Sequence, residues 1–301
     1  MMKRILLASD GSRYAEDAAR FVARWPHRET LGIIVVSVLY IPPQRTSSLT
    51  SDWAEQLIAQ ESESALGTFA RIKHVFEGAN VELEHVVVQG HPGESICSLA
   101  KSRACDLVVM GAKGHSMIDR ILLGSTSDFV ATQASCSVLV VRPRDDKSTN
   151  KPLRIAIGFD ETGPSQTALE EIAEIHWGAE VQIDVVSVWH IEGMYDLPET
   201  AHMQKSATRA AKQLRDVSPD AEAHLVNCEN FGEGLVTYAE NSECDVMVVG
   251  ETPRNFVKRI LLGSTTRYVL RHASCSVWIT RNKMIRGLAK KTESDSMVES
   301  R

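Results

Sequence analysis

Two glycine clusters in the first half of the chain have the residue types and spacing of a phosphate-binding loop. Gly111 follows the apolar run DLVVM, Gly114 comes three residues later, and Gly124 and Ser125 stand beyond nine more residues. Glycines just after a strand allow close backbone approach, so several N–H groups can converge on an anion. Ser125 and Thr126 are expected to open and cap the next helix, whose N–H groups then face a phosphate. The alternative is a pair of tight turns and an ordinary helix cap.

Asp10 is a second candidate for chemistry, at the end of the apolar run RILLAS. A short carboxylate at the end of a strand can accept a hydrogen bond from a ribose hydroxyl or an adenine amine. Its alternative role is to cap the following helix, a task that Ser12 can share.

Hydrolysis of a bound nucleotide has weaker support in the sequence. The chain has no GxxxxGK[ST] segment, so the lysine of that phosphate-binding class is missing. Lys113, His115 and Arg120 lie in the loop, and histidine is the type suited to general-base work near neutral pH. Arg120 recurs as Arg259 in a half with an altered loop, which favours a structural salt bridge over phosphate contact. We therefore assign no catalytic residue.

An internal repeat organises the chain. Residues 103–142 recur as residues 242–281 at a constant offset of 139, with 18 identities in 40 aligned pairs. The start of each half also matches, because RILLASD recurs as RIAIGFD at an offset of 150. The first half thus carries 11 extra residues, for which PPQRTSSLTSDW is the expected place. Such self-similarity predicts two similar domains in tandem.

The polar stretch between the repeats and the composition of the C-terminus set the expected boundaries. We predict a first domain over residues 1–143, a linker over 144–152, a second domain over 153–282 and a disordered tail over 283–301.

Within each half, strand-like and helix-like segments alternate. GIIVVSVL is a continuous β-branched run, typical of a strand buried on both faces, while RYAEDAARFVARW has apolar residues at helical spacing. This alternation predicts an α/β fold with a parallel sheet and helices on both faces. Sheets of this kind bind ligands beyond the carboxyl ends of their strands.

Composition excludes several classes of protein. The chain has 301 residues, a net charge of −6 and 43% hydrophobic residues, with no apolar run near the roughly 20 residues that span a bilayer. We expect a cytoplasmic protein that binds neither nucleic acid nor membrane.

Two further candidate sites, one of cysteines and one of possible metal ligands, have simpler explanations. Cys105, Cys136 and their counterparts Cys244 and Cys275 are read as buried thiols rather than redox sensors. A metal site at His190, His202, Asp196 and Glu199 is disfavoured, because their spacing matches no standard zinc pattern.

The pattern G-x2-G-x9-G-S resembles the nucleotide-binding signature of the ATP-binding universal stress proteins, and ASDGS resembles the first-strand motif of that family. The resemblance covers nearly the whole chain twice. It implies two tandem five-stranded parallel sheets of the Rossmann-like, adenine nucleotide α-hydrolase type, which hold ATP with Mg²⁺. By this resemblance, Asp10 and Val38 line the adenine and ribose pocket. The residues expected around the phosphates are Met110, Gly111, Gly114, Gly124, Ser125, Thr126 and Ser127.

The second half departs from the family pattern. Pro253 replaces the second glycine, which removes a backbone donor, and Glu251 would repel phosphate if it faces the site. Glu161 and Thr162 stand where the first half has Gly11 and Ser12. We therefore expect weak ATP binding, or none, in this half. The weaker counterpart site comprises Asp160, Val188, Val249, Gly250, Gly263, Ser264, Thr265 and Thr266.

These observations favour an ATP-binding regulatory protein of the stress response, with the nucleotide held mainly by the first half. The alternatives are a slow ATPase or phosphotransferase on the same scaffold, and a nucleotide-free interaction module. The resemblance also implies pairing through the last strands, SVLVVR and SVWITR, either within one chain as a pseudo-dimer or between chains in a homodimer.

Overall fold

The structure is a computed structural model that describes residues 2, 4–26, 30–40, 51–114, 123–142, 152–175, 177, 180–190, 197–251 and 262–281. The predicted tail and residues 144–151 of the predicted linker lie outside these residues, as do His115, Arg120, Asp196, Pro253 and Arg259. Residues 2–134 and 140–142 form one compact unit, and the second repeat lies in the other. Each half is described by itself below.

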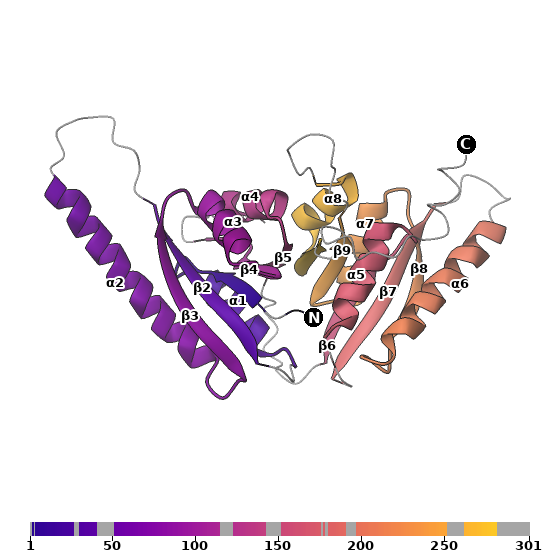
Figure 1. Cartoon of the computed structure of the whole chain (residues 1–301). Helices are drawn as coiled ribbons and strands as arrows, with labels where there is room; N and C mark the ends of the chain where they lie inside the picture. Colours follow the sequence, from indigo (N-terminus) through magenta and orange to yellow (C-terminus); the bar gives the residue numbers. More distant parts are fainter. Residues whose placement is uncertain are drawn as a thin grey trace. The chain divides into compact units, whose positions relative to one another are not determined.

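The first half alternates strands and helices as the sequence predicts (Figure 1). Its elements are β1 (Arg4–Ala8), α1 (Arg13–Ala23), β2 (Leu31–Leu39), α2 (Ser51–Val75), β3 (Val81–Gln89), α3 (Pro92–Ser102), β4 (Leu107–Gly111), α4 (Ser125–Gln133) and β5 (Ser137–Val141).

The second half repeats this order. Its elements are β6 (Leu153–Gly158), α5 (Gly163–Ala173), β7 (Val181–Trp189), α6 (Leu197–Leu214), β8 (Glu222–Asn227), α7 (Phe231–Asn241), β9 (Val246–Gly250), α8 (Ser264–His272) and β10 (Ser276–Thr280).

The two halves have the same sheet topology, and the predicted α/β fold with parallel sheets is confirmed. The strand order is β3-β2-β1-β4-β5 in the first half and β8-β7-β6-β9-β10 in the second. β1 pairs in parallel with both β2 and β4, and β6 pairs in the same way with β7 and β9. Because the order reverses after the first strand, the carboxyl ends of β1 and β4 bound a crevice at the switch point, and those of β6 and β9 bound the equivalent one.

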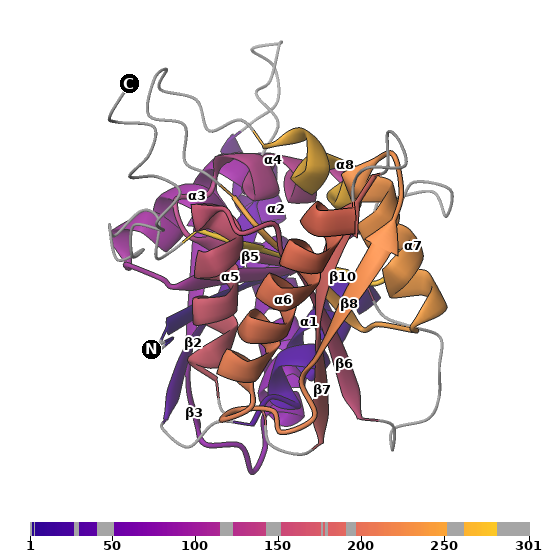
Figure 2. The same ribbon diagram turned by 90° about the vertical axis from the view of Figure 1, so that its right-hand side faces the viewer.

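Helices cover the sheet of each half on both faces. In the first half α1 packs beside α2, and α3 packs beside α4. In the second half, which faces the viewer in Figure 2, α5 and α6 lie in front of the strands, and α7 pairs with α8. The four positions of α1 with helical apolar spacing, Ala15, Ala18, Ala19 and Val22, are all buried, as the sequence predicts.

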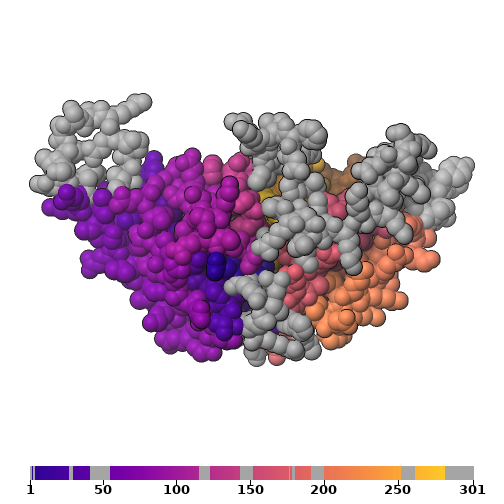
Figure 3. Space-filling view, viewed as in Figure 1, coloured from indigo at the N-terminus to yellow at the C-terminus, as the bar shows by residue number. Residues whose placement is uncertain are grey.

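The core of each half consists of the central strands and the inward faces of the helices. Ile5, Leu6 and Leu7 of β1 are at most 1% exposed, which explains their continuous apolar pattern. The outward faces of α2 and α6 are exposed, and Figure 3 shows this for the orange α6. Among the described residues, no helix is long and apolar enough to cross a membrane.

Candidate functional site

The first half has a cavity of about 240 Å³ at the carboxyl ends of β1, β2 and β4. All nine residues proposed from the sequence line it, although they come from four separate segments of the chain. They are Asp10, Val38, Met110, Gly111, Gly114, Gly124, Ser125, Thr126 and Ser127. Lys113, which the sequence places in the loop as a possible phosphate contact, also lines the cavity. The lining residues that the sequence did not indicate are Ala8, Ser9, Ala15, Val36, Pro92 and Ile96. The fold therefore gathers the whole candidate set in one place.

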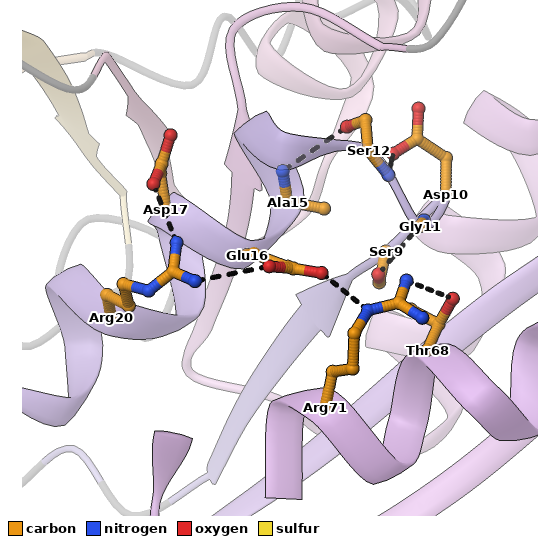
Figure 4. Close-up of polar contacts among 10 residues, drawn as sticks. All are labelled: Ser9, Asp10, Gly11, Ser12, Ala15, Glu16, Asp17, Arg20, Thr68 and Arg71. Atoms are coloured by element: carbon orange, nitrogen blue, oxygen red, sulfur yellow. Dashed lines mark hydrogen bonds and ion pairs between the residues drawn. The ribbon is translucent and has the colours of Figure 1, made fainter. Parts of the chain in front are cut away.

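Asp10 lies in a tight turn between β1 and α1 (Figure 4). Its Oδ1 accepts a hydrogen bond from the Ser12 N–H at 3.0 Å, and the Ser9 hydroxyl oxygen accepts one from the Gly11 N–H at 3.3 Å. Ser12 is the N-cap of α1 and accepts from the Ala15 N–H, so the capping bond comes from Ser12 and not from Asp10. In Figure 4 the second carboxylate oxygen of Asp10 points away from this turn.

An ion-pair network anchors the helix that follows this turn (Figure 4). The Arg71 Nε of α2 lies 2.6 Å from the Glu16 Oε1 of α1, and Arg20 bridges Glu16 and Asp17. The hydrogen bond from Arg71 lowers the pKa of Glu16. The network therefore ties α1, which carries the Asp10 turn, to α2.

The turn requires a left-handed backbone in both halves. Gly11 has a φ of 77°, and its counterpart Glu161 has a φ of 61°. A residue with a β-carbon pays about 1–2 kcal/mol in this region, whereas glycine does not. In the second half Glu161 is held by the Ser206 hydroxyl and by His202 Nε2, both from α6, the latter at 3.0 Å.

Gly11→Ala is expected to lower the free energy of unfolding by about 1 kcal/mol, because a left-handed backbone is unfavourable for alanine but not for glycine. Thermal unfolding followed by circular dichroism measures the change. An unfolding free energy equal to that of the wild type would show that this turn tolerates a β-carbon.

The glycine at the end of β4 is required by helix packing. A β-carbon on Gly111 would lie 2.7 Å from the Tyr14 Cβ and 2.8 Å from the Tyr14 carbonyl oxygen of α1. In the second half a β-carbon on Gly250 would clash with the Pro164 carbonyl oxygen. Gly111 therefore lets α1 approach β4, a role that is independent of any ligand. Gly114 is different, because a β-carbon there would lie 2.6 Å from Asp10 Oδ2.

The N-terminus of α4 faces the cavity, but its cap differs from the prediction. Gly124, with φ −77° and ψ 155°, is the N-cap and makes no side-chain capping bond, so the assignment of this role to Ser125 and Thr126 is wrong. The reason is that Ser125 is already helical, and the first helical bond runs from the Asp128 N–H to the Gly124 carbonyl. The N–H groups of Ser125, Thr126 and Ser127 therefore precede the helical hydrogen-bond ladder.

Two side chains at this end of the cavity have further contacts. The buried Ser127 hydroxyl donates to the Gly111 carbonyl oxygen at 2.9 Å, which ties α4 to the end of β4. The Lys113 Nζ lies 5.8 Å from the centroid of the Tyr14 ring. Lys113 thus adds a cation to the lining where the α4 N-terminus contributes the positive end of its dipole.

The second half has a larger cavity, of about 590 Å³, at the equivalent place. All eight residues of the weaker site line it: Asp160, Val188, Val249, Gly250, Gly263, Ser264, Thr265 and Thr266. Asp160 Oδ1 accepts from both the N–H and the hydroxyl of Thr162, so the aspartate turn is kept. Helix α8 again begins after a glycine N-cap, Gly263.

Glu251 distinguishes the two cavities. It lines the second cavity, but its side chain is 2% exposed and its Oε2 lies 2.8 Å from Arg281 Nη2. Its Oε1 accepts the Gly263 N–H at 3.2 Å, whereas in the first half the Gly124 N–H donates to the Ala112 carbonyl at 2.7 Å. The carboxylate therefore stands beside the glycine N-cap and is paired with a buried guanidinium, a partner that the sequence did not reveal.

The cysteines noted in the sequence line neither cavity. Cys105, Cys136, Cys244 and Cys275 are buried, as expected. Burial raises the pKa of Cys105 to about 11 and that of Cys244 to about 12, which keeps these thiols protonated and unreactive near neutral pH. Within the described part of the chain, no group of three or more metal-ligating side chains comes together.

A parallel sheet with its cavity at the switch point, bounded by an aspartate turn and a glycine-capped helix N-terminus, defines a Rossmann-like α/β domain. The chain contains two such domains and belongs to the Universal stress protein family, whose profile matches residues 1–142 and again residues 153–281.

Individual relatives match one domain or both. Universal stress protein MJ0531 of Methanocaldococcus jannaschii is 31% identical over 148 residues, which are 47% of this chain and 83% of that protein. A universal stress protein of Mycolicibacterium smegmatis is 25% identical over 288 residues, 92% of this chain and 96% of its own. The crystal structure of a universal stress protein from Archaeoglobus fulgidus shares the fold, with a TM-score of 0.65 at 19% identity over 92% of this chain and 98% of that one. The tandem arrangement is thus common to full-length relatives.

Proposed function

We propose that this chain is an ATP-binding regulatory protein of the stress response, in which the first half holds the nucleotide. The observation that carries the proposal is the convergence, around one cavity, of the Asp10 turn, the two glycine clusters and the first N–H groups of α4. A polyphosphate needs several backbone donors and a positive dipole at one end of its site. Family membership is consistent with this assignment but does not identify the ligand.

The lining divides into an apolar part and a phosphate part. Val36, Val38 and Met110 supply apolar wall for the adenine, and the Asp10 carboxylate accepts from the ribose. The α- to γ-phosphates lie against Gly114, Gly124 and the N–H groups of Ser125, Thr126 and Ser127, with Lys113 as a cation. Mg²⁺ enters with the phosphates, ligated mainly by phosphate oxygens and water.

The second half is proposed to hold ATP less tightly than the first. Its Glu251 carboxylate stands beside the Gly263 N-cap, where the first half has the methyl group of Ala112. The carboxylate is paired with Arg281, so the two side chains together offer a polyphosphate no net positive charge at this end of the cavity. The cytoplasmic location and the pairing of the last strands stay predictions from the sequence. Slow hydrolysis of the bound ATP is the alternative to a purely regulatory binding role, and release of ADP beyond one turnover per chain would favour it.

The decisive measurement is calorimetric titration of the full chain with ATP and Mg²⁺, compared with Gly114→Pro. The intact chain should bind about one ATP tightly, and the variant should lose at least about 100-fold in affinity. Proline removes a backbone donor, and its β-carbon meets the Asp10 carboxylate. The fold should tolerate the change, because the second half carries Pro253 at this position.

Gly67→Ala is the control, since Gly67 lies on the exposed side of α2 with nothing within 4 Å of an added β-carbon. It should leave ATP binding unchanged. Absence of ATP binding by the intact chain would overturn the proposal and favour a nucleotide-free interaction module. If Gly114→Pro bound ATP as tightly as the intact chain, the glycine loop would have no part in ATP binding.

A further inference from the structure

We infer that the second cavity binds a purine nucleoside that carries no polyphosphate chain. The two cavities are therefore specialised for different ligands: a nucleoside triphosphate in the first half and an uncharged nucleoside in the second. This inference rests on the proposed function, because it assigns to the second half the base and sugar parts of the same site. It rests on the size, the aromatic wall and the charge of the second cavity.

The second cavity has more room for a base than the first. Its volume of about 590 Å³ lies within the range of small-molecule sites, against about 240 Å³ in the first half. Two of its lining residues are smaller than their counterparts: Gly158 stands where the first half has Ala8, and Val249 where it has Met110. The second half has therefore not lost its binding site through filling of the cavity by side chains.

An aromatic side chain lines this cavity where the first half has a proline. Phe231, the first residue of α7, is 51% exposed and corresponds to Pro92, the first residue of α3. Phe231 lines the cavity, and its ring can stack on a flat base, since stacking on an aromatic face accepts any purine. Leu235, Val186 and Val188 complete an apolar wall beside it.

The polar groups of the cavity favour a sugar and disfavour a phosphate chain. Asp160 is held by Thr162 at the position where Asp10 stands in the first half, so a carboxylate remains available to the ribose region. At the other end, Glu251 lies at the Gly263 N-cap and its charge is balanced by Arg281. The pair contributes no net positive charge, so a triphosphate would gain no compensating cation from it.

The test uses the full chain carrying Gly114→Pro, which removes tight ATP binding by the first half, titrated with adenosine and separately with ATP. Adenosine should bind with an affinity at least about 10-fold higher than that of ATP. Phe231→Ala in this chain should weaken adenosine binding at least about 10-fold, which locates the nucleoside in the second half. Phe231→Leu keeps apolar bulk without a ring face and should show the same loss, if Phe231→Ala proves unstable.

Leu66→Ala is the matched control, because Leu66 is an exposed apolar residue, 60% exposed, on α2 of the first half. It should leave adenosine binding unchanged. Glu251→Gln keeps an oxygen for the Gly263 N–H but removes the charge, and it should raise ATP affinity in the Gly114→Pro chain at least about 10-fold.

Three results would overturn the inference: no adenosine binding, ATP binding as tight as adenosine in the Gly114→Pro chain, or adenosine binding unaffected by both Phe231 variants. Failure of the proposed function is separate from these, because it is decided by ATP binding to the intact chain. A chain that binds ATP in its first half but no adenosine in its second would refute the inference alone.

Discussion

Glu251→Ala is expected to lower the free energy of unfolding of the second half by about 3–5 kcal/mol, because it leaves a buried guanidinium without its carboxylate. Arg281 is 1% exposed and lies 2.8 Å from Glu251, and the Gly263 N–H also loses its acceptor. Chemical denaturation of the full chain, followed by fluorescence and circular dichroism, should show an earlier transition for one half.

Glu240→Ala provides the comparison, since Glu240 is exposed on α7 and alanine is a better helix former. It should change the unfolding free energy by no more than about 0.5 kcal/mol. If Glu251→Ala were as mild as this control, the ion pair would have no part in holding β9 and β10 together.

Gly111→Ala is expected to destabilise the first half by about 1–3 kcal/mol, with or without a nucleotide present. The added β-carbon would press on the Tyr14 backbone at 2.8 Å, and backbone atoms cannot rotate aside as a side chain can. Thermal unfolding in the absence of nucleotide isolates this packing effect from ligand binding.

Gly67→Ala should act in the opposite direction, raising stability by up to about 1 kcal/mol, because it replaces a helical glycine in open space. An unchanged melting temperature for Gly111→Ala would mean that the signature glycine at the end of β4 serves the ligand alone. The structure gives Gly111 a packing role, and among the other signature glycines only Gly114 would bring an added β-carbon against a cavity side chain, that of Asp10.

The sequence was sufficient for the fold, for reasons visible in particular elements. The β-branched run of β2 is buried on both faces, and α1 has its apolar residues at helical spacing, so each pattern had one consistent structure. The repeat then predicted the second half from the first. The place of the cavity followed from topology, because strands that are parallel place their carboxyl ends together, whereas the full set of lining residues came from the family resemblance.

Two features of the site could not be read from the sequence. Serine and threonine are preferred N-caps, so a glycine followed by serine gave no reason to move the cap of α4 to Gly124. The partner of Glu251 is Arg281, 30 residues away on the far side of α8 in the chain, and pairing at such separation depends on tertiary packing. Alignment of the two halves offered one signal for this pair. Arg142 is equivalent to Arg281, whereas Ala112 is equivalent to Glu251, so the glutamate is particular to the second half.

The turn after β6 has a consequence for local motion. The turn of the first half needs no support for its left-handed residue, because that residue is Gly11. In the second half the left-handed residue is Glu161, and Ser206 and His202 of α6 hold its carboxylate. Amide hydrogen exchange at Thr162 should therefore accelerate whenever α6 loosens, and Ser206→Ala should raise it while leaving exchange at Ser12 unchanged.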